Sequence, residues 1–114
     1  MNRELICDPS KIDFSHMRVS IGGGMAVQPA VAQEWKEKTG QTILQGYGLT
    51  ETSPVAICCK MGSEFDGSIG LPVPSTDVMI VGDDGNPLPL NEVGEICIKG
   101  PQVMEGYWQR PKET

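Results

Sequence analysis

The sequence has few of the residues that usually build metal sites. It contains one histidine, His16, and its four cysteines, Cys7, Cys58, Cys59 and Cys97, form no C-x-x-C pair. This spacing gives no support to a structural zinc site, which needs closely spaced cysteine and histidine ligands. We therefore expect His16 to be a surface residue and the cysteines to be reduced thiols. The adjacent Cys58 and Cys59 could form a strained ring, but an apolar strand that holds both explains them more simply.

Positive charge and long apolar runs are also scarce. The chain has 9 Lys and Arg against 15 Asp and Glu, which gives a net charge of -6. A negative field repels phosphate backbones and argues against nucleic acid as a partner. No apolar run approaches the length of a transmembrane segment, and residues 1–4 lead into no signal-type apolar region. We expect a cytoplasmic protein without a transmembrane segment.

The length and composition suit a small globular unit. A chain of 114 residues has room for one core, or for a share of a larger one. Its 14 glycines and 9 prolines indicate many turns rather than disorder.

The first half of the chain has the pattern of a strand, a helix and a second strand. Residues 17–21 alternate apolar and polar side chains, as a strand does with one face on a core. Residues 29–38 predict an amphipathic helix with Val27, Val31 and Trp35 on one face, starting at Pro29 and ending before Gly40. Residues 42–44 predict a second strand. A helix-length crossover implies two parallel strands, and parallel strands need neighbours in a larger sheet.

From residue 55 the pattern changes to short β-type runs separated by turns. Runs at residues 55–59, 78–81 and 95–99 predict strands. Residues 82–86 predict a hairpin turn between 78–81 and 87–90, and residues 91–94 predict another turn. We expect an antiparallel β unit here. A polar loop at residues 61–67 suggests a boundary between an α/β nucleotide-binding subdomain at 1–62 and an antiparallel β subdomain at 63–114.

Two loops carry the chemistry. The run Gly22, Gly23 and Gly24 ends the first strand and leads into a helix, so its backbone N–H groups could meet a ligand closely, although a tight turn without a ligand explains it equally well. The segment QGYGLTET at residues 45–52 follows the second strand, at the edge where open α/β sheets bind ligands.

Three side chains of this second loop suit a nucleotide. The ring of Tyr47 can stack on a base, the hydroxyl of Thr50 can donate to a phosphate, and the carboxylate of Glu51 is a hard ligand for Mg²⁺. Each also has a simpler interpretation, as a core residue, a helix cap and a surface charge respectively.

The segment QGYGLTET resembles the signature of the adenylate-forming superfamily, which includes acyl-CoA synthetases, luciferases and the adenylation domains of peptide synthetases. Residues 13–25 are similar to the glycine segment that precedes this signature, and residues 67–76 and 94–108 resemble segments that follow it. The later segments are most similar to bacterial long-chain fatty-acid CoA ligases. Residues 1–12 show no recognisable signature.

The resemblance implies a fold, a reaction and a set of ligands. The fold class would be α/β followed by antiparallel β, as a fragment of the large N-terminal domain: a β-α-β unit plus a small β-barrel-like subdomain. A fatty acid would react with ATP to give acyl-adenylate, and coenzyme A would then displace AMP, with ATP, Mg²⁺ and coenzyme A as cofactors. Peripheral contact with the cytosolic face of the membrane is compatible with a fatty-acid substrate.

The resemblance also assigns roles to individual residues. Tyr47 would stack on adenine, Thr50 would bind the α-phosphate, and Glu51 would hold Mg²⁺, so that Thr50 and Glu51 are the catalytic candidates. Gly24 and Gly46 would lie against the base and the entrance of the acyl chain. The cofactor-binding candidates are Gly23, Gly24, Gln45, Gly46, Tyr47, Gly48, Leu49 and Thr50.

Other parts of the family pattern have no counterpart in these 114 residues. They are the Ser/Thr/Gly-rich loop ending in Lys, the Asp on the ribose hydroxyls, the interdomain hinge and the C-terminal lysine that drives adenylation. We therefore expect an internal fragment that is inactive alone and self-associates. Two alternatives stay open: a fragment of an aryl- or amino-acid-activating relative, or a non-catalytic module that binds an adenylate.

Overall fold

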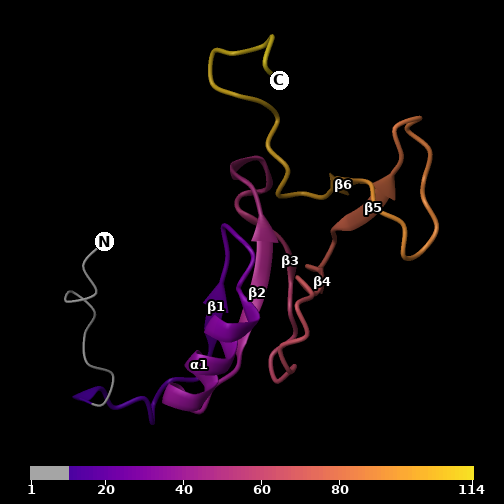
Figure 1. Ribbon diagram of the computed structural model, residues 1–114. Helices are drawn as coiled ribbons and strands as arrows, with labels where there is room; N and C mark the ends of the chain where they lie inside the picture. Colours follow the sequence, from indigo (N-terminus) through magenta and orange to yellow (C-terminus); the bar gives the residue numbers. More distant parts are fainter. Residues whose placement is uncertain (1–10) are drawn as a thin grey trace, which may run out of the picture.

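The computed structural model describes residues 11–114, and its first half contains a β-α-β unit (Figure 1). Strand β1 (Ser20–Gly22) pairs in parallel with β2 (Ile43–Gly48), with Ser20 opposite Ile43. Helix α1 (Pro29–Thr39) connects them. The predicted parallel pair is therefore confirmed. The first strand starts later than expected because its pairing with β2 begins only at Ser20, and residues 17–19 precede this ladder.

Helix α1 begins and ends where its sequence predicts. Pro29 occupies the first turn, and Gly40 takes the left-handed conformation at φ 71° and donates its N–H to the Lys36 carbonyl at 2.8 Å. The buried side chain, however, is Ala32, whereas the expected core residue Val31 is 53% exposed. The helix is thus rotated relative to the predicted face, because a small side chain lets it lie close to its neighbours.

Strand β2 is longer than predicted and pairs on both sides. Beyond its parallel half, Gly46 and Tyr47 pair antiparallel with β3 (Val55–Cys58), which pairs with β4 (Leu71–Pro72). The four strands form one sheet in the order β1-β2-β3-β4. Residues 45–48, expected to be a loop, are therefore strand, because β3 returns along them and satisfies their backbone groups.

A single turn of 3₁₀ helix, η3 (Thr50–Thr52), joins β2 to β3. Buried Thr52 stabilises it: its hydroxyl accepts the Leu49 N–H at 2.9 Å and donates to the Pro54 carbonyl at 2.7 Å. The end of β2 passes so close to the residue before β3 that a Cβ built on Gly48 would lie 1.6 Å from the Pro54 carbonyl oxygen. Glycine at residue 48 is required for this crossing.

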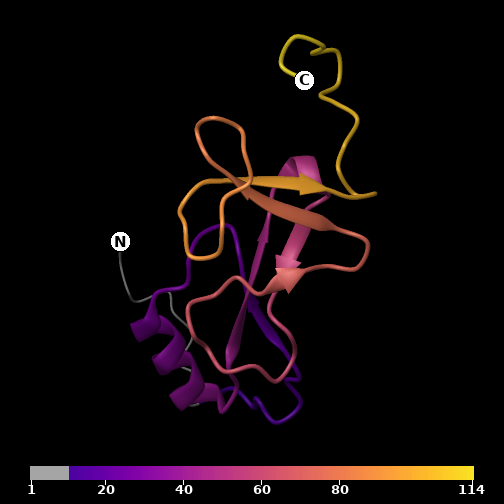
Figure 2. The same ribbon diagram turned by 90° about the vertical axis from the view of Figure 1, so that its right-hand side faces the viewer.

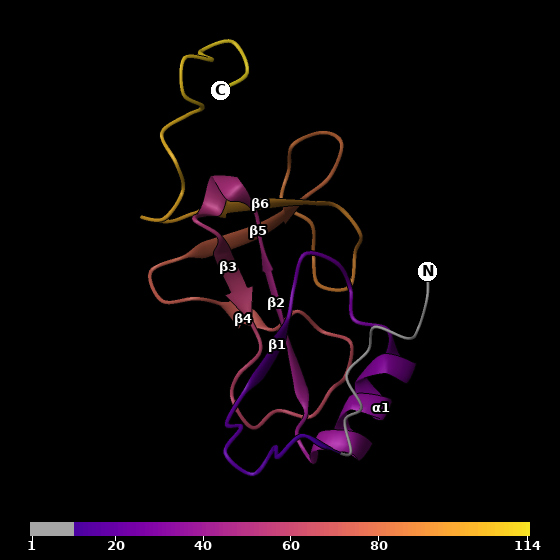
Figure 3. The same cartoon turned by 90° about the vertical axis from the view of Figure 1, so that its left-hand side faces the viewer.

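The second half contains a separate antiparallel ribbon. Strand β5 (Asp77–Val81) pairs with β6 (Glu95–Lys99), and Figures 2 and 3 show the ribbon running crosswise to the strands of the four-stranded sheet. The predicted turn at 82–86 forms: the Gly82 N–H donates to the Asn86 carbonyl at 3.0 Å. Hydrogen bonds from Asn86 hold the pKa of Asp84 below its ordinary value.

The expected barrel-like unit is present only as this ribbon. Within residues 11–114 the strands form the four-stranded sheet and the two-stranded β5-β6 ribbon, without a closed barrel. Strand β4 lies beyond residue 63 yet belongs to the first sheet. The division of the chain at 62/63 stays a prediction.

Little apolar surface is buried. Among the described residues the buried hydrophobic side chains are Ala32, Leu44, Ala56, Ile57 and Val81. By contrast, Leu71 is 71% exposed and Ile21 on the edge strand β1 is 60% exposed. Residues 11–114 contain no helix that is long and apolar enough to cross a bilayer.

Candidate functional site

The loop after β1 and the end of β2 enclose a pocket of about 290 Å³. It lies at the carboxyl ends of the two parallel strands, which is where open α/β sheets bind ligands. The residues that line it are Gly24, Met25, Ala26, Gln45, Gly46, Tyr47, Gly48, Leu49 and Ile69. The structure therefore brings together most of the cofactor-binding residues predicted from the sequence.

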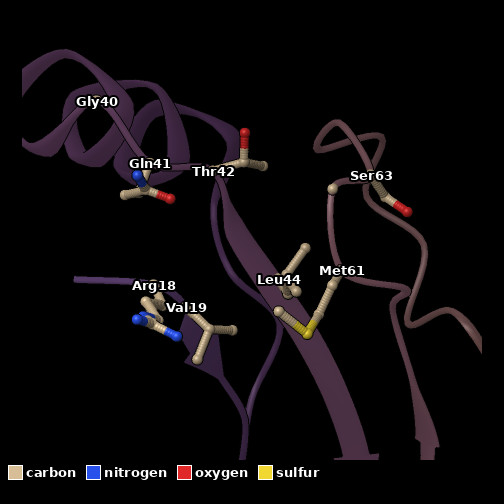
Figure 4. A pocket seen from close by; sticks show the side chains of 9 residues that line it. Arg18, Val19, Gly40, Gln41, Thr42, Leu44, Met61 and Ser63 are labelled. Carbon is tan, nitrogen blue, oxygen red and sulfur yellow. The ribbon is translucent and has the colours of Figure 1, made fainter. Parts of the chain in front are cut away.

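A second pocket, of about 170 Å³, lies at the opposite ends of these strands (Figure 4). Arg18, Val19 and Thr42, which line it, precede β1 and β2, and Met61 lies beside Leu44. Because the amino ends of parallel strands are not the usual ligand side, and because no sequence motif falls here, we assign the candidate site to the first pocket.

Glycines keep one wall of the candidate site free of side chains. Gly24 has a φ of 82°, a conformation that L-residues rarely adopt, and no atom lies within 4 Å of a Cβ built on it. Gly23 does not line the pocket, but a Cβ there would be 3.2 Å from the Gly46 carbonyl oxygen. The two glycine segments thus approach each other closely, and a flat ligand could lie against bare backbone at Gly24.

Gln45 connects the two sides of the pocket through a buried side chain. It is 4% exposed; its Oε1 accepts the Val27 N–H at 2.9 Å, and its Nε2 donates to the Ser68 carbonyl at 3.1 Å. Cys59 Sγ donates to the same carbonyl at 3.2 Å. Since both ends of the amide are engaged, Gln45 acts here by positioning the β1-α1 loop and the loop before β4.

Tyr47 and Ile69 show how this positioning shapes the pocket. Tyr47 is half-buried in β2 and lines the pocket with its neighbours. Ile69 reaches the pocket from a loop that is distant in sequence and directly follows Ser68, the residue bonded to Gln45. Sequence reasoning recognised residues 67–76 but assigned no role to Ile69, because only the folded loop brings it to the site.

The two catalytic candidates lie just beyond the pocket, in η3. Thr50 is exposed and Glu51 is half-buried. The Glu51 carboxylate accepts a hydrogen bond from the hydroxyl of Tyr107, and the Glu51 carbonyl accepts the Met104 N–H at 2.8 Å. The sequence did not predict these two partners of Glu51, although residues 106–108 lie in one of the segments that resemble the superfamily.

The carboxylate of Glu51 fits a role with a metal nucleotide. Mg²⁺ in nucleotide sites commonly takes one or two protein carboxylates together with phosphate oxygens. Tyr107 engages one Glu51 oxygen, and no hydrogen bond from the described residues engages the other. Residues 11–114 contain no group of three or more His, Cys, Asp or Glu arranged to hold a metal.

The remaining sequence expectations concern His16 and the thiols. His16 is exposed, as expected. Cys58, Cys59 and Cys97 are free, so the adjacent pair does not form a ring. Cys7, together with the segment at 1–4, lies outside the described residues.

We expect Gln45→Leu to destabilise the protein by about 1–3 kcal/mol, because the Val27 N–H and the Ser68 carbonyl would lose their partner. Thermal unfolding of the full-length natural protein measures this as a lower Tm. The matched control is Gln33→Leu. The Gln33 amide donates to Glu37 on the exposed face of α1, at 2.7 Å, and its loss should cost at most about 0.5 kcal/mol. Equal effects of the two substitutions would show that the buried bridge has no special role.

Comparison with known proteins identifies the family. The profile of the family described as AMP-binding enzyme matches residues 2–108. A long-chain-fatty-acid–CoA ligase of Haemophilus influenzae is 50% identical over 105 residues, with 91% of this chain and 19% of that protein covered. A long-chain-fatty-acid–CoA ligase of Yersinia pestis is 55% identical over 108 residues, with 90% and 18% covered.

A solved structure also has a similar fold. ATP-bound MatB from Rhodopseudomonas palustris is similar with a TM-score of 0.79 at 33% identity, with 88% of this chain and 20% of that chain covered. The chain spans about a fifth of the length of the curated relatives it matches. Because the family profile covers nearly all of the chain, this protein belongs to the AMP-binding enzyme family.

Proposed function

We propose that this chain supplies the adenylate-binding part of a long-chain fatty-acid CoA ligase, an acid–thiol ligase that uses ATP. The observation that carries the proposal is the continuity of the site: the pocket walled by Gly24 and Tyr47 leads directly to Thr50 and Glu51 in η3. The two relatives that are 50% and 55% identical support the fatty-acid substrate.

Each residue has a defined role in this proposal. Adenine lies between the ring of Tyr47 and the bare backbone at Gly24, where stacking is sterically open. The exposed hydroxyl of Thr50 donates to the α-phosphate, and Glu51 holds Mg²⁺ against the phosphates. Gly46 lies beside the entrance of the acyl chain.

The proposed reaction has two steps. A carboxylate oxygen of the fatty acid attacks the α-phosphorus of ATP, and the bond to the β-phosphate breaks, which yields acyl-adenylate and pyrophosphate. The thiol of coenzyme A, as thiolate, then attacks the acyl carbon and releases AMP. Mg²⁺, when bound, neutralises phosphate charge during the first step. The chain's own residues act by position: Tyr47 orients the base, and Thr50 and Glu51 orient the phosphates.

We also propose how this chain relates to the whole enzyme. It corresponds to part of the large N-terminal domain, with an α/β subdomain at 1–62 and an antiparallel β subdomain at 63–114. The ribbon of β5 and β6 belongs to a small barrel-like unit. This is supported by its outer edges: β5 is bridged there at Val81 to Pro87, and β6 pairs with no further strand of residues 11–114. The whole enzyme is cytoplasmic and contacts the cytosolic face of the membrane peripherally, because long-chain fatty acids partition into bilayers.

The function is tested by ATP–pyrophosphate exchange with the full-length natural protein. Long-chain fatty acids should support exchange, and coenzyme A should convert the product to acyl-CoA. Exchange with ferulate or an amino acid, but not with fatty acids, would assign the chain to an aryl- or amino-acid-activating relative. Nucleotide binding without exchange for any acid would favour a non-catalytic adenylate-binding module.

Glu51→Gln should reduce exchange strongly, by about 100-fold or more, because the neutral amide is a poor ligand for Mg²⁺ and does not offset phosphate charge. Tm should stay nearly unchanged. The matched control is Glu92→Gln in the loop that precedes β6, and this variant should exchange at the wild-type rate. Wild-type exchange in Glu51→Gln would remove Glu51 from the mechanism.

Tyr47→Ala should weaken ATP binding by about 1–3 kcal/mol, the range for a base stacked on an aromatic ring. Tyr47→Phe should bind nearly as well as the wild type, because the ring face is retained. Isothermal titration with ATP measures both. If the two variants lose the same affinity, the hydroxyl is the functional group and the stacking arrangement is wrong.

The 114-residue chain by itself should self-associate and lack ligase activity. Among residues 11–114, strand β1 has no strand partner on its outer edge. Ile21 on this strand is 60% exposed, and Val31 on α1 is 53% exposed. Such surfaces pair with a second copy when nothing covers them. Light scattering over a concentration series should show growing particles. A monomer at high concentration that catalyses exchange would contradict both halves of this expectation.

A further inference from the structure

We propose that Tyr107 is a positioning residue for Glu51: its hydroxyl orients the carboxylate that meets the metal nucleotide. The inference rests on the proposed function, since it concerns how Glu51 performs that role. Tyr107 lies 56 positions from Glu51 in the sequence, so only the fold brings the two together.

Two separate contacts connect this part of the chain to Glu51. The Tyr107 hydroxyl donates to Glu51 Oε1, and three residues earlier the Met104 N–H donates to the Glu51 carbonyl at 2.8 Å. One contact is made by a side chain and the other by backbone, and both converge on the same residue. The segment 104–107 therefore lies directly against η3, the turn that follows β2 at the end of the sheet (Figures 1 and 3).

A partner of this kind fixes the side chain of Glu51, which is half-buried. It lies in a 3₁₀ turn of three residues, between exposed Thr50 and buried Thr52. A glutamate side chain has several rotatable bonds, and ordering it costs conformational entropy. A hydroxyl that donates to one oxygen holds the carboxylate in place before the nucleotide arrives and leaves the second oxygen for the cation.

Tyr107 is itself held by local hydrogen bonds. Its backbone N–H donates to Thr114 Oγ1 at 3.0 Å, and its carbonyl accepts the Arg110 N–H at 3.1 Å. Thr114 Oγ1 also donates to the Arg110 carbonyl at 2.9 Å. These bonds close residues 107–114 into a turn that holds the backbone of Tyr107.

The competing interpretation is that Tyr107 only attaches residues 104–114 to the rest of the described structure. The two roles predict different effects. Loss of an attachment lowers stability and leaves the affinity for a cation unchanged. Loss of a partner that orients a ligand carboxylate weakens cation binding, typically by about 10–100-fold, with little effect on stability.

The test substitutes Tyr107→Phe in the full-length natural protein, which removes the hydroxyl and keeps the ring. Mn²⁺ binding in the presence of ATP, without fatty acid, is measured by electron paramagnetic resonance, together with the Mg²⁺ concentration that half-saturates exchange. We expect both to weaken by about 10–100-fold while Tm is retained. The matched control is Trp108→Phe at the neighbouring, 88% exposed aromatic, which should change neither.

A double-variant cycle with Glu51→Gln shows whether Tyr107 acts through Glu51. If it does, Tyr107→Phe adds almost nothing once Glu51 is already a glutamine. The proposal is overturned if Tyr107→Phe weakens Mn²⁺ binding as much in the Glu51→Gln variant as in the wild type. It is also overturned if Tyr107→Phe lowers Tm and leaves Mn²⁺ affinity unchanged.

The same cycle separates this proposal from the function on which it rests. Normal Mn²⁺ binding in Tyr107→Phe, with impaired binding in Glu51→Gln, refutes the positioning role and leaves the proposed function intact. Normal binding in Glu51→Gln refutes the metal assignment itself, and the role of Tyr107 with it.

Discussion

The buried side-chain amide of Gln45 is the interaction on which the pocket depends. Gln45 lies on the inner strand β2. Its amide is hydrogen-bonded to the Val27 N–H on one side and to the Ser68 carbonyl on the other. Gln45 is 4% exposed, and burying its amide without hydrogen-bond partners would cost free energy. The buried amide is therefore favourable only when both loops supply their partners. The same bonds thus fix the glycine loop after β1 and the loop that carries Ile69.

Strand β2 connects the candidate pocket to the turn η3. Its parallel half faces β1 and its antiparallel half faces β3, so the strand runs from the α/β unit directly to the turn η3. The close crossing at Gly48 and the buried hydroxyl of Thr52 hold that turn at the strand end. Thr50 and Glu51 consequently lie next to a pocket that their own side chains do not build.

The exposed apolar surface agrees with the family relationship. The chain spans about a fifth of its relatives' length. Within residues 11–114, β1 is an edge strand of the sheet, and side chains such as Ile21 and Leu71 are exposed. In a larger protein such surfaces are usually covered by further strands and helices. This arrangement explains why the local motifs are well formed although few side chains of the described residues are fully buried.

Local pattern was enough to predict the β-α-β unit, the ends of α1 at Pro29 and Gly40, and the β5 and β6 strands. The ligand-binding roles of the residues around Tyr47 stay a prediction. Helix caps, glycine turns and alternating strands depend on neighbours in the sequence, so they can be read without a fold. Only the tertiary structure decided that residues 45–48 are strand, that Gln45 connects two loops, and that Tyr107 meets Glu51. These features depend on contacts between residues distant in the sequence, and no local periodicity encodes which of those residues meet.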